Sequence, residues 1–507
     1  MTSVSPSSNP SSNDRSPNGR AENEFDVAII GAGIVGASLF RELSRYRIRV
    51  VLLERENDVA LGASRANSAI VHCGCDPKAG TAMARFNTAG NRMFPDLCRQ
   101  LDVPFVQNGS LICAFSDEEL PVIKALYDNG RANGVEHLEI LDTDSARALE
   151  PNLASTVRGA LFAPTGGIVG PYELTTALAE NGVVNEGVLL LNFDTEAISR
   201  SEKGPFTVTA ADGRTIAARF VVNAAGINAD KVHNLIARPT FEIRPRRGEY
   251  YVFDKSQGAL FDRTIFVCPG KLGKGILVSP TVHGNLIAGP NAQDGIARDD
   301  TAVTAAGLAE VRAGAARITE AISWRDSIRN FAGLRAVSTR DDFIIEEAPD
   351  QKGFFDLAGI KSPGLTSAPA IALAARDLLA DAGLDLVEKK DFNPNRHETR
   401  FLSLPPEQRR ALAARDGAYG RIVCRCESIT EGEIIESIRR PVGATTLDGV
   451  KRRCRPGSGR CQGGFCSVRV LEILARELGK DQREILQDKA GSSIILGCRG
   501  PVQGGAQ

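Results

Sequence analysis

Four cysteines near the C-terminal end have the types and spacing of a metal–sulfur site. Cys424 and Cys426 form a C-x-C pair, and Cys461 and Cys466 form a C-x4-C pair. Four thiolates are the ligand set of a [2Fe-2S] cluster, and they also suit a structural zinc ion. Because C-x-C combined with C-x4-C is not a usual zinc spacing, the pattern favours iron–sulfur chemistry.

Local sequence signals predict short helices beside these cysteines. Thr430-Glu-Gly-Glu433 has the pattern of a capping box that opens a helix. Cys466 directly precedes an amphipathic run with Val470, Leu471, Leu474 and Leu478 on one face. A cysteine at a helix N-terminus has a lowered pKa and is readily held as thiolate.

A second site is predicted near the N-terminus, where Gly31-Ala-Gly33-Ile-Val-Gly36 forms a G-x-G-x-x-G motif. Gly31 permits a tight turn, Gly33 lets the backbone approach a pyrophosphate, and Gly36 allows close helix–sheet packing. The amides at a helix N-terminus bind phosphate. The motif therefore predicts dinucleotide binding, and the alternative is a glycine turn that binds nothing.

The elements around this motif support the prediction. Residues 25–30 form an apolar run typical of a buried strand, residues 34–44 have helical character, and residues 49–54 predict a second strand. This order is a βαβ unit on a parallel sheet. Glu54 ends the second strand, where it can accept hydrogen bonds from a ribose, and Arg55 beside it is a further cofactor-binding candidate.

Three segments resemble the D-amino-acid-oxidase-like superfamily of FAD enzymes. They are Gly62-Ala-Ser64-Arg-Ala-Asn67-Ser68-Ala-Ile-Val-His72, Val222-Asn223-Ala-Ala-Gly226 and Ala358-Gly359-Ile-Lys-Ser-Pro-Gly364-Leu365-Thr366. The resemblance implies FAD as the dinucleotide. It places Ser64, Asn67 and Ser68 along the pyrophosphate and ribityl chain, and Gly364, Leu365 and Thr366 at the isoalloxazine ring.

Further motifs resemble the anaerobic-type glycerol-3-phosphate dehydrogenases, some of which end in the same iron–sulfur module. They are Pro245-Arg-Arg-Gly-Glu-Tyr-Tyr, Gly273-Lys274-Gly-Ile-Leu-Val-Ser-Pro-Thr, Gly284-Asn-Leu-Ile-Ala-Gly-Pro and Phe331-Ala-Gly-Leu-Arg335. The cysteine module is similar to bacterioferritin-associated-ferredoxin-like domains. The resemblance implies an α/β fold. We expect a Rossmann-like FAD-binding domain interleaved with an α+β substrate domain, followed by a small helical [2Fe-2S] domain.

The predicted catalytic residues are His72, Arg335 and Lys274. A neutral His72 imidazole could take the hydroxyl proton of a substrate, and the alternative is a histidine that only binds cofactor or backbone. The planar fork of Arg335 suits a phosphate or carboxylate, with Lys274 and Arg246 as further candidate clamps.

The chain departs from its relatives at Cys73 and Cys75, where Ala and Tyr are usual, and at Cys454, where Thr is usual; Cys454 is left as an alternative cluster ligand.

Length and composition indicate several domains in a reducing compartment. The chain has 507 residues, more than one core usually supports, and a formal net charge of -1, which gives no reason to expect nucleic acid. An odd count of 11 cysteines with no long apolar run favours a cytoplasmic protein without a transmembrane segment, with peripheral membrane docking left open. The expected parts are a tail (1–24), the oxidoreductase (25–387), a linker (388–420), the [2Fe-2S] domain (421–485) and a tail (486–507).

The function expected from these features is FAD-dependent oxidation of sn-glycerol 3-phosphate to dihydroxyacetone phosphate. The substrate would be a small anion, and electrons would pass through the cluster to an acceptor protein or quinone. Two alternatives stay open. One is a dehydrogenase subunit for an opine, imino acid or 2-hydroxy acid, and the other is a non-enzymatic iron–sulfur transfer or sensor protein.

Overall fold

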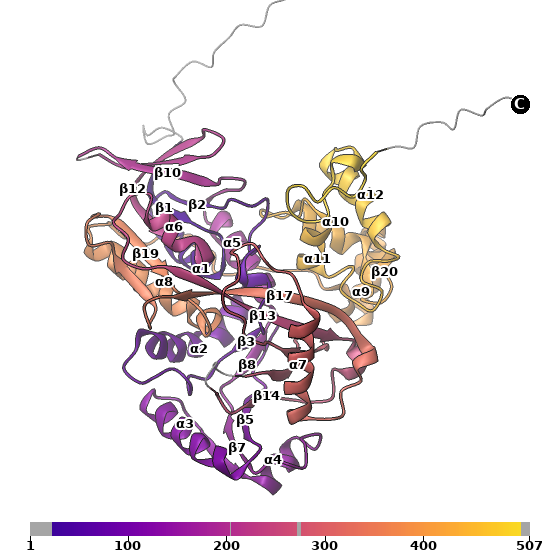
Figure 1. Ribbon diagram of the computed structural model, residues 1–507. Coiled ribbons are helices and arrows are strands. Elements are labelled where there is room, and N and C mark those ends of the chain that lie inside the picture. The colour runs from indigo at the N-terminus through magenta and orange to yellow at the C-terminus, as the bar shows by residue number, and fades with distance from the viewer. Residues whose placement is uncertain (1–22, 203, 271–274, 498–507) are drawn as a thin grey trace, which may run out of the picture.

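The computed structural model describes residues 23–202, 204–270 and 275–497. A large body made of two interleaved parts carries a small C-terminal module on one side, drawn in yellow in Figure 1. The predicted N-terminal tail to residue 22, Lys274 and the final residues 498–507 lie outside the described residues.

The first sheet is the one predicted from the glycine motif. Its centre is β1 (Glu24–Ile30), which pairs in parallel with β2 (Val50–Leu53) and β12 (Thr215–Asn223). The remaining strands are β9 (Val188–Leu190), β10 (Thr195–Arg200), β11 (Phe206–Ala210), β18 (Ile344–Glu347) and β19 (Phe354–Ala358). The helices packed together over it are α1 (Ile34–Leu43), α2 (Ala82–Leu101), α5 (Pro171–Val184) and α8 (Gly364–Asp381). The expected Rossmann-like βαβ start is confirmed.

Two glycines of the motif are required by close backbone contacts. Gly31 has a φ of +105°, a conformation that side-chain-bearing residues rarely adopt. A Cβ on Gly36 would lie 2.0 Å from the carbonyl oxygen of Gly31. The turn and the first turn of α1 therefore pack directly against each other, as the motif predicts.

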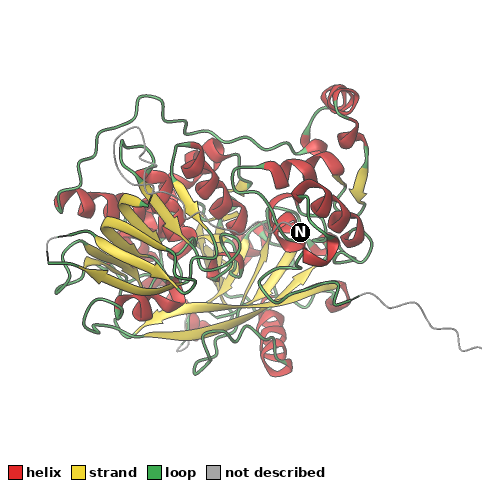
Figure 2. Cartoon of the chain, turned by 90° about the horizontal axis from the view of Figure 1, so that it is seen from above, coloured by secondary structure: helices red, strands yellow, loops and turns green. Residues whose placement is uncertain are grey.

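The second sheet runs in the order β17-β13-β16-β15-β14-β5-β7-β6. These strands are β17 (Ser327–Ser338), β13 (Ile243–Phe253), β16 (Leu286–Gly289), β15 (Leu277–Pro280), β14 (Thr264–Val267), β5 (Ser110–Ala114), β7 (Gly159–Ala163) and β6 (Glu139–Asp142). Since β5 pairs with β14, segments far apart in sequence share one sheet, and the two parts of the body are interleaved. Seen from above, the strands form two groups with helices packed over them (Figure 2).

The C-terminal module is small and mostly helical. A short hairpin of β20 (Ile422–Cys424) and β21 (Ile429–Thr430) leads into α10 (Glu431–Arg439), α11 (Leu447–Cys454) and α12 (Ser467–Leu478). The capping box at Thr430 and Glu433 is present with both of its hydrogen bonds. The apolar faces of these helices form one core that includes Ile434, Val450, Ile473 and Leu474.

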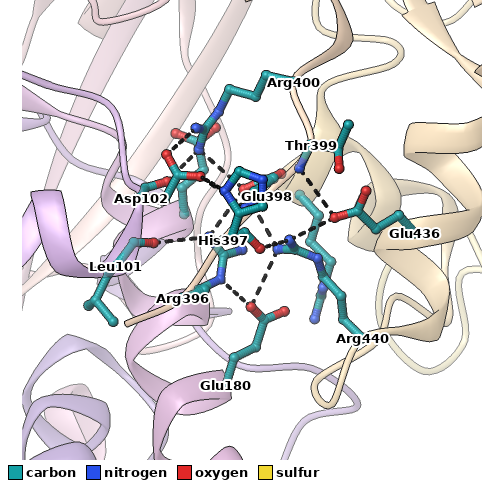
Figure 3. Close-up of polar contacts among 12 residues, drawn as sticks. Leu101, Asp102, Glu180, Arg396, His397, Glu398, Thr399, Arg400, Glu436 and Arg440 are labelled. Atoms are coloured by element: carbon teal, nitrogen blue, oxygen red, sulfur yellow. Dashed lines mark hydrogen bonds and ion pairs between the residues drawn. The ribbon is translucent and has the colours of Figure 1, made fainter. Parts of the chain in front are cut away.

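Within the segment predicted as a linker, Arg396 and Glu398 form a buried ionic latch with Glu180 of the large body and Arg440 of the module (Figure 3). Glu180 of α5 pairs with Arg396 of the linker segment and with Arg440 of the module. Glu398 pairs with the same two arginines. These four side chains are only 4% to 11% exposed. Further along, α9 (Pro406–Arg415) follows this segment.

We expect Glu180→Gln to lower the free energy of unfolding by about 1.5–3 kcal/mol, because two buried guanidinium groups would each lose one charged hydrogen-bond partner while keeping Glu398. The measurement is thermal or denaturant unfolding. The control is Asp96→Asn, which breaks a pair with Arg99 whose side chains are 71% and 76% exposed and should cost about 0–1 kcal/mol. Equal stability of the two variants would contradict a stabilising latch.

Candidate functional site

A cavity of about 720 Å³ is lined by residues from both sheets. Its lining residues include many predicted from sequence: Ser64, Asn67, Ser68, His72, Arg246, Arg335, Gly364 and Leu365. The N-terminus of α1, at Ile34 and Val35, forms part of the same wall. The fold therefore brings the glycine motif, the segment after the second strand and the start of α8 to one place.

Glu54 is held at the glycine turn by backbone amides. Ala32 N donates to Oε2 of Glu54 at 2.8 Å, and Glu56 N donates to Oε1 at 3.0 Å. Burial raises the pKa of Glu54 above its ordinary value. Arg55 is half exposed and contacts Glu56 at 3.3 Å. The ribose contact of Glu54 and the cofactor role of Arg55 stay predictions.

The glycine turn keeps bare backbone at positions where a side chain would crowd its neighbours. A Cβ on Gly31 would lie 2.6 Å from the Ala224 carbonyl oxygen, and one on Gly33 would lie 3.3 Å from Ser64 Oγ. Ser64 Oγ accepts from Ile34 N at 2.8 Å, so this hydroxyl reaches the first amides of α1. The bare backbone and the helix N-terminus fit the pyrophosphate of FAD.

Asn67 and Ser68 have different tasks along the cavity wall. Asn67 donates to the carbonyls of Ala63 and Ser64 and accepts from Ala69 N, so its amide shapes the segment itself. Ser68 Oγ lies 3.2 Å from Tyr250 Oη, which places the serine hydroxyl in contact with a side chain of β13.

His72 lies at the cavity wall with its ring near the start of α8. Its Nε2 is 3.2 Å from Ser362 Oγ, and its backbone N donates to Thr366 Oγ1 at 2.9 Å. Thr366 is fully buried, so its hydroxyl positions the His72 backbone and is not among the residues that line the cavity. The ring centroid of His72 lies 5.9 Å from that of Phe266.

Two arginines face the cavity from neighbouring strands. Arg246 on β13 and Arg335 on β17 are direct partners in the antiparallel register. Arg246 makes a bidentate pair with Asp294 at 2.6 and 2.8 Å, whereas Arg335 Nη2 donates to the Asn291 carbonyl at 3.0 Å. Among the described residues, no carboxylate lies within ion-pair distance of Arg335. Its charge is therefore the better placed of the two for an anionic ligand.

Tyr250 is a cavity residue to which the sequence analysis assigned no role. It is buried, stacks on Phe331 with ring centroids 4.5 Å apart, and contacts Ser68 through its hydroxyl. The signal that could have found it is the strand period: Arg246 and Tyr250 are four positions apart, so both point to the same face of β13. Lys361 also lines the cavity, from the loop before α8.

The four predicted cluster cysteines converge at one end of the module. Cys424 Sγ and Cys461 Sγ each lie 3.8 Å from Cys426 Sγ. A hydrogen bond from Cys466 lowers the pKa of Cys424 to about 5. Within the described part of the chain, no three His, Cys, Asp or Glu side chains are arranged to hold a single metal ion. Four thiolates gathered at one place are the ligand set that a [2Fe-2S] cluster requires.

The contacts of Cys454 differ from those of the four predicted ligands. Its Sγ donates to the Val450 carbonyl at 3.6 Å, one turn back along α11, and it packs against the module's core. Burial raises its pKa well above the ordinary value. These contacts keep Cys454 within α11 and the module's core, outside the sulfur–sulfur contacts of Cys424, Cys426 and Cys461, so the four predicted ligands stay the preferred set.

The module docks directly on the segment that lines the cofactor cavity. Asp58, which follows the second strand, pairs with both Arg452 and Arg453 of α11. Asp488 pairs with Arg452 and with Arg65, the neighbour of Ser64. The cysteine-bearing module and the flavin segment are thus joined by a continuous chain of charged groups.

We expect Cys461→Ser to remove the iron while FAD stays bound, because the ionic contacts to the flavin segment come from α11 and Asp488 and not from the cysteines. Iron and flavin analysis of anaerobically purified protein tests this. Cys454→Ser is the matched control and should retain two iron atoms per chain. Loss of iron from the control, or its retention in Cys461→Ser, would contradict the ligand assignment.

Comparisons with known proteins agree with both sites. Residues 26–378 match the family described as FAD dependent oxidoreductase, and residues 422–476 match the BFD-like [2Fe-2S] binding domain. The chain is 50% identical to a glycerol 3-phosphate dehydrogenase of Caloramator mitchellensis, over 93% of this chain and 98% of that protein. It is 31% identical to a glycerol 3-phosphate oxidase of Mycoplasma genitalium, over 73% of this chain and 98% of that protein.

A solved structure supports the same conclusion. The reduced L-alpha-glycerophosphate oxidase of Mycoplasma pneumoniae with FAD bound is 30% identical, with a TM-score of 0.70, and covers 74% of this chain and 98% of that chain. The chain therefore belongs to the FAD-dependent oxidoreductase family, and it carries a BFD-like [2Fe-2S] binding domain at its C-terminal end.

Proposed function

We propose that this chain oxidises sn-glycerol 3-phosphate to dihydroxyacetone phosphate with FAD and passes the electrons on through its [2Fe-2S] cluster. The observation that carries the proposal is Arg335. Its guanidinium group faces the same cavity as His72 and the glycine turn, without a carboxylate partner among the described residues. The glycerol 3-phosphate dehydrogenase that aligns over 93% of the chain supports this substrate.

FAD, when bound, supplies the hydride acceptor for carbon C2 of the substrate. The chain then has two tasks. Arg335 binds the phosphate through its planar fork, which fixes the orientation of the substrate. His72 accepts the proton of the C2 hydroxyl at a ring nitrogen, and its backbone is held by Thr366 and by the amides of Asn87 and Asn91. Lys274 is outside the described residues, and its role as a second clamp stays a prediction.

The electron acceptor is proposed to approach the outer face of the cluster site. Cys426 is exposed there, and the Phe465 side chain between the last two cysteines is 88% exposed. A partner protein or a quinone could therefore come close to the cluster. None of the helices in the described ranges is long and apolar enough to span a membrane.

We expect Arg335→Lys to lower kcat/KM for glycerol 3-phosphate about ten- to hundred-fold, because lysine keeps the charge but loses the bidentate fork. FAD content should not change. Arg246→Lys is the matched control: Arg246 faces the same cavity but is already paired with Asp294, so its effect should be much smaller. Anaerobic flavin bleaching by substrate provides the measurement.

The same assay tests the substrate class. Glycerol 3-phosphate should reduce the wild-type flavin far faster than glycerol, since the phosphate is the group that Arg335 holds. If both fail while a 2-hydroxy acid or an opine bleaches the flavin, the clamp binds a carboxylate and the proposed substrate is wrong. Wild-type kinetics in Arg335→Lys would overturn the clamp.

A further inference from the structure

Two thiols touch each other at the wall of the active-site region. Cys73 Sγ and Cys75 Sγ lie 3.1 Å apart. The residue between them, Gly74, has a φ of +114°, and a Cβ there would lie 2.5 Å from Thr88 Cγ2. Only glycine fits this tight turn, which brings the side chains on either side of it together.

The turn is held in place by asparagine side chains from α2 and α3 (Leu120–Ala132). Asn87 and Asn91 donate to the carbonyl of His72, Asn133 of the loop after α3 donates to that of Gly74, and Asn129 donates to that of Cys75. The backbone on both sides of each thiol is therefore fixed before any reaction. Two reacting groups held in contact have a high effective concentration, so a bond between them forms readily.

The pair is reachable from the flavin cavity. Cys73 is half-buried, Cys75 is 3% exposed, and both line a small side cavity together with His72, Asp76, Phe266 and Val267. Those last four residues also line the main cavity. The two cavities therefore adjoin, and a molecule as small as a peroxide that enters or forms in the main cavity is close to this dithiol.

We propose that Cys73 and Cys75 form a reversible oxidation site at which hydrogen peroxide closes a disulfide and halts substrate oxidation. One thiol loses its proton and attacks peroxide as a thiolate, the O–O bond breaks, and the departing hydroxide takes up that proton, so a sulfenic acid and one water form. The second thiol displaces the sulfenic oxygen as a second water, and the S–S bond forms. Two thiols and one peroxide thus give one disulfide and two waters. Peroxide is the product whenever dioxygen takes two electrons from a reduced flavin.

The switch acts through the neighbouring residue. Bonded sulfurs lie about 2.05 Å apart, so the two sulfurs must approach by roughly 1 Å. His72 directly precedes Cys73, and its carbonyl is held by two asparagines. Because this carbonyl is held, movement of Cys73 strains the backbone of His72 or shifts the His72 side chain. A displacement of about 1 Å in a catalytic group can cost about a hundred-fold in rate. A thiol reductant should reverse the effect.

The experiment treats the anaerobic holoenzyme with one equivalent of hydrogen peroxide, removes the excess with catalase, and divides the sample. Peptide mapping of one half should show Cys73 and Cys75 joined within one peptide that has lost two hydrogen atoms. In the other half, flavin reduction by glycerol 3-phosphate should be at least about ten-fold slower and should recover with dithiothreitol. The mapping does not depend on the proposed substrate, so a wrong substrate and a wrong switch are distinguishable.

Variants separate this pair from other thiols. Cys73→Ser should keep the untreated rate and lose the peroxide effect. Cys268→Ser, which removes another thiol of the same apolar cluster, should stay sensitive. The proposal is overturned if the peptide carries only sulfinic acid on one cysteine, if Cys75 pairs with Cys268, if the disulfide forms without loss of rate, or if Cys73→Ser is inactivated as fast as wild type.

Discussion

The buried carboxylate of Asp58 connects the large body to the C-terminal module. Burial alone would raise its pKa, but Arg453 and Arg452 lower it below the ordinary value. A buried charge without its partner is very costly, so these groups favour the fully docked module over any partly separated arrangement. Asp58 belongs to the loop whose Ala60 N donates to the Ala32 carbonyl of the glycine turn. The same carboxylate that docks the module is therefore anchored to the dinucleotide site.

A second set of ion pairs fixes the orientation of the module relative to the large body. The latch of Glu180, Arg396, Glu398 and Arg440 joins α5, residues 396–400 and the residue directly after α10 (Figure 3). Two separate ionic contacts resist rotation about either one. For a protein that moves electrons between a flavin and a cluster, a constant distance between the two sites is the useful consequence.

The two arginines that face the cavity differ in what their charged groups contact. Arg246 and Arg335 are register partners, but Asp294 makes its hydrogen bonds to Arg246 and not to Arg335, which leaves the fork of Arg335 for an anion. The dithiol of Cys73 and Cys75 directly follows His72 in the chain, within a turn whose carbonyls are held by four asparagines. The polar groups around the cavity thus divide into those that hold backbone and those that face the ligand.

The sequence by itself determined the local features. The strand–glycine turn–helix start, the capping box at Thr430 and the spacing within each cysteine pair depend on residues close together in the chain, whose geometry follows from backbone sterics and short-range hydrogen bonds. Tertiary structure alone decided which charges remain available. Asp294 neutralises Arg246 across 48 positions, and Asp58 meets Arg453 across 395. Strand register and domain docking are set by the packing of whole surfaces, and no spacing in the sequence encodes such a long-range contact.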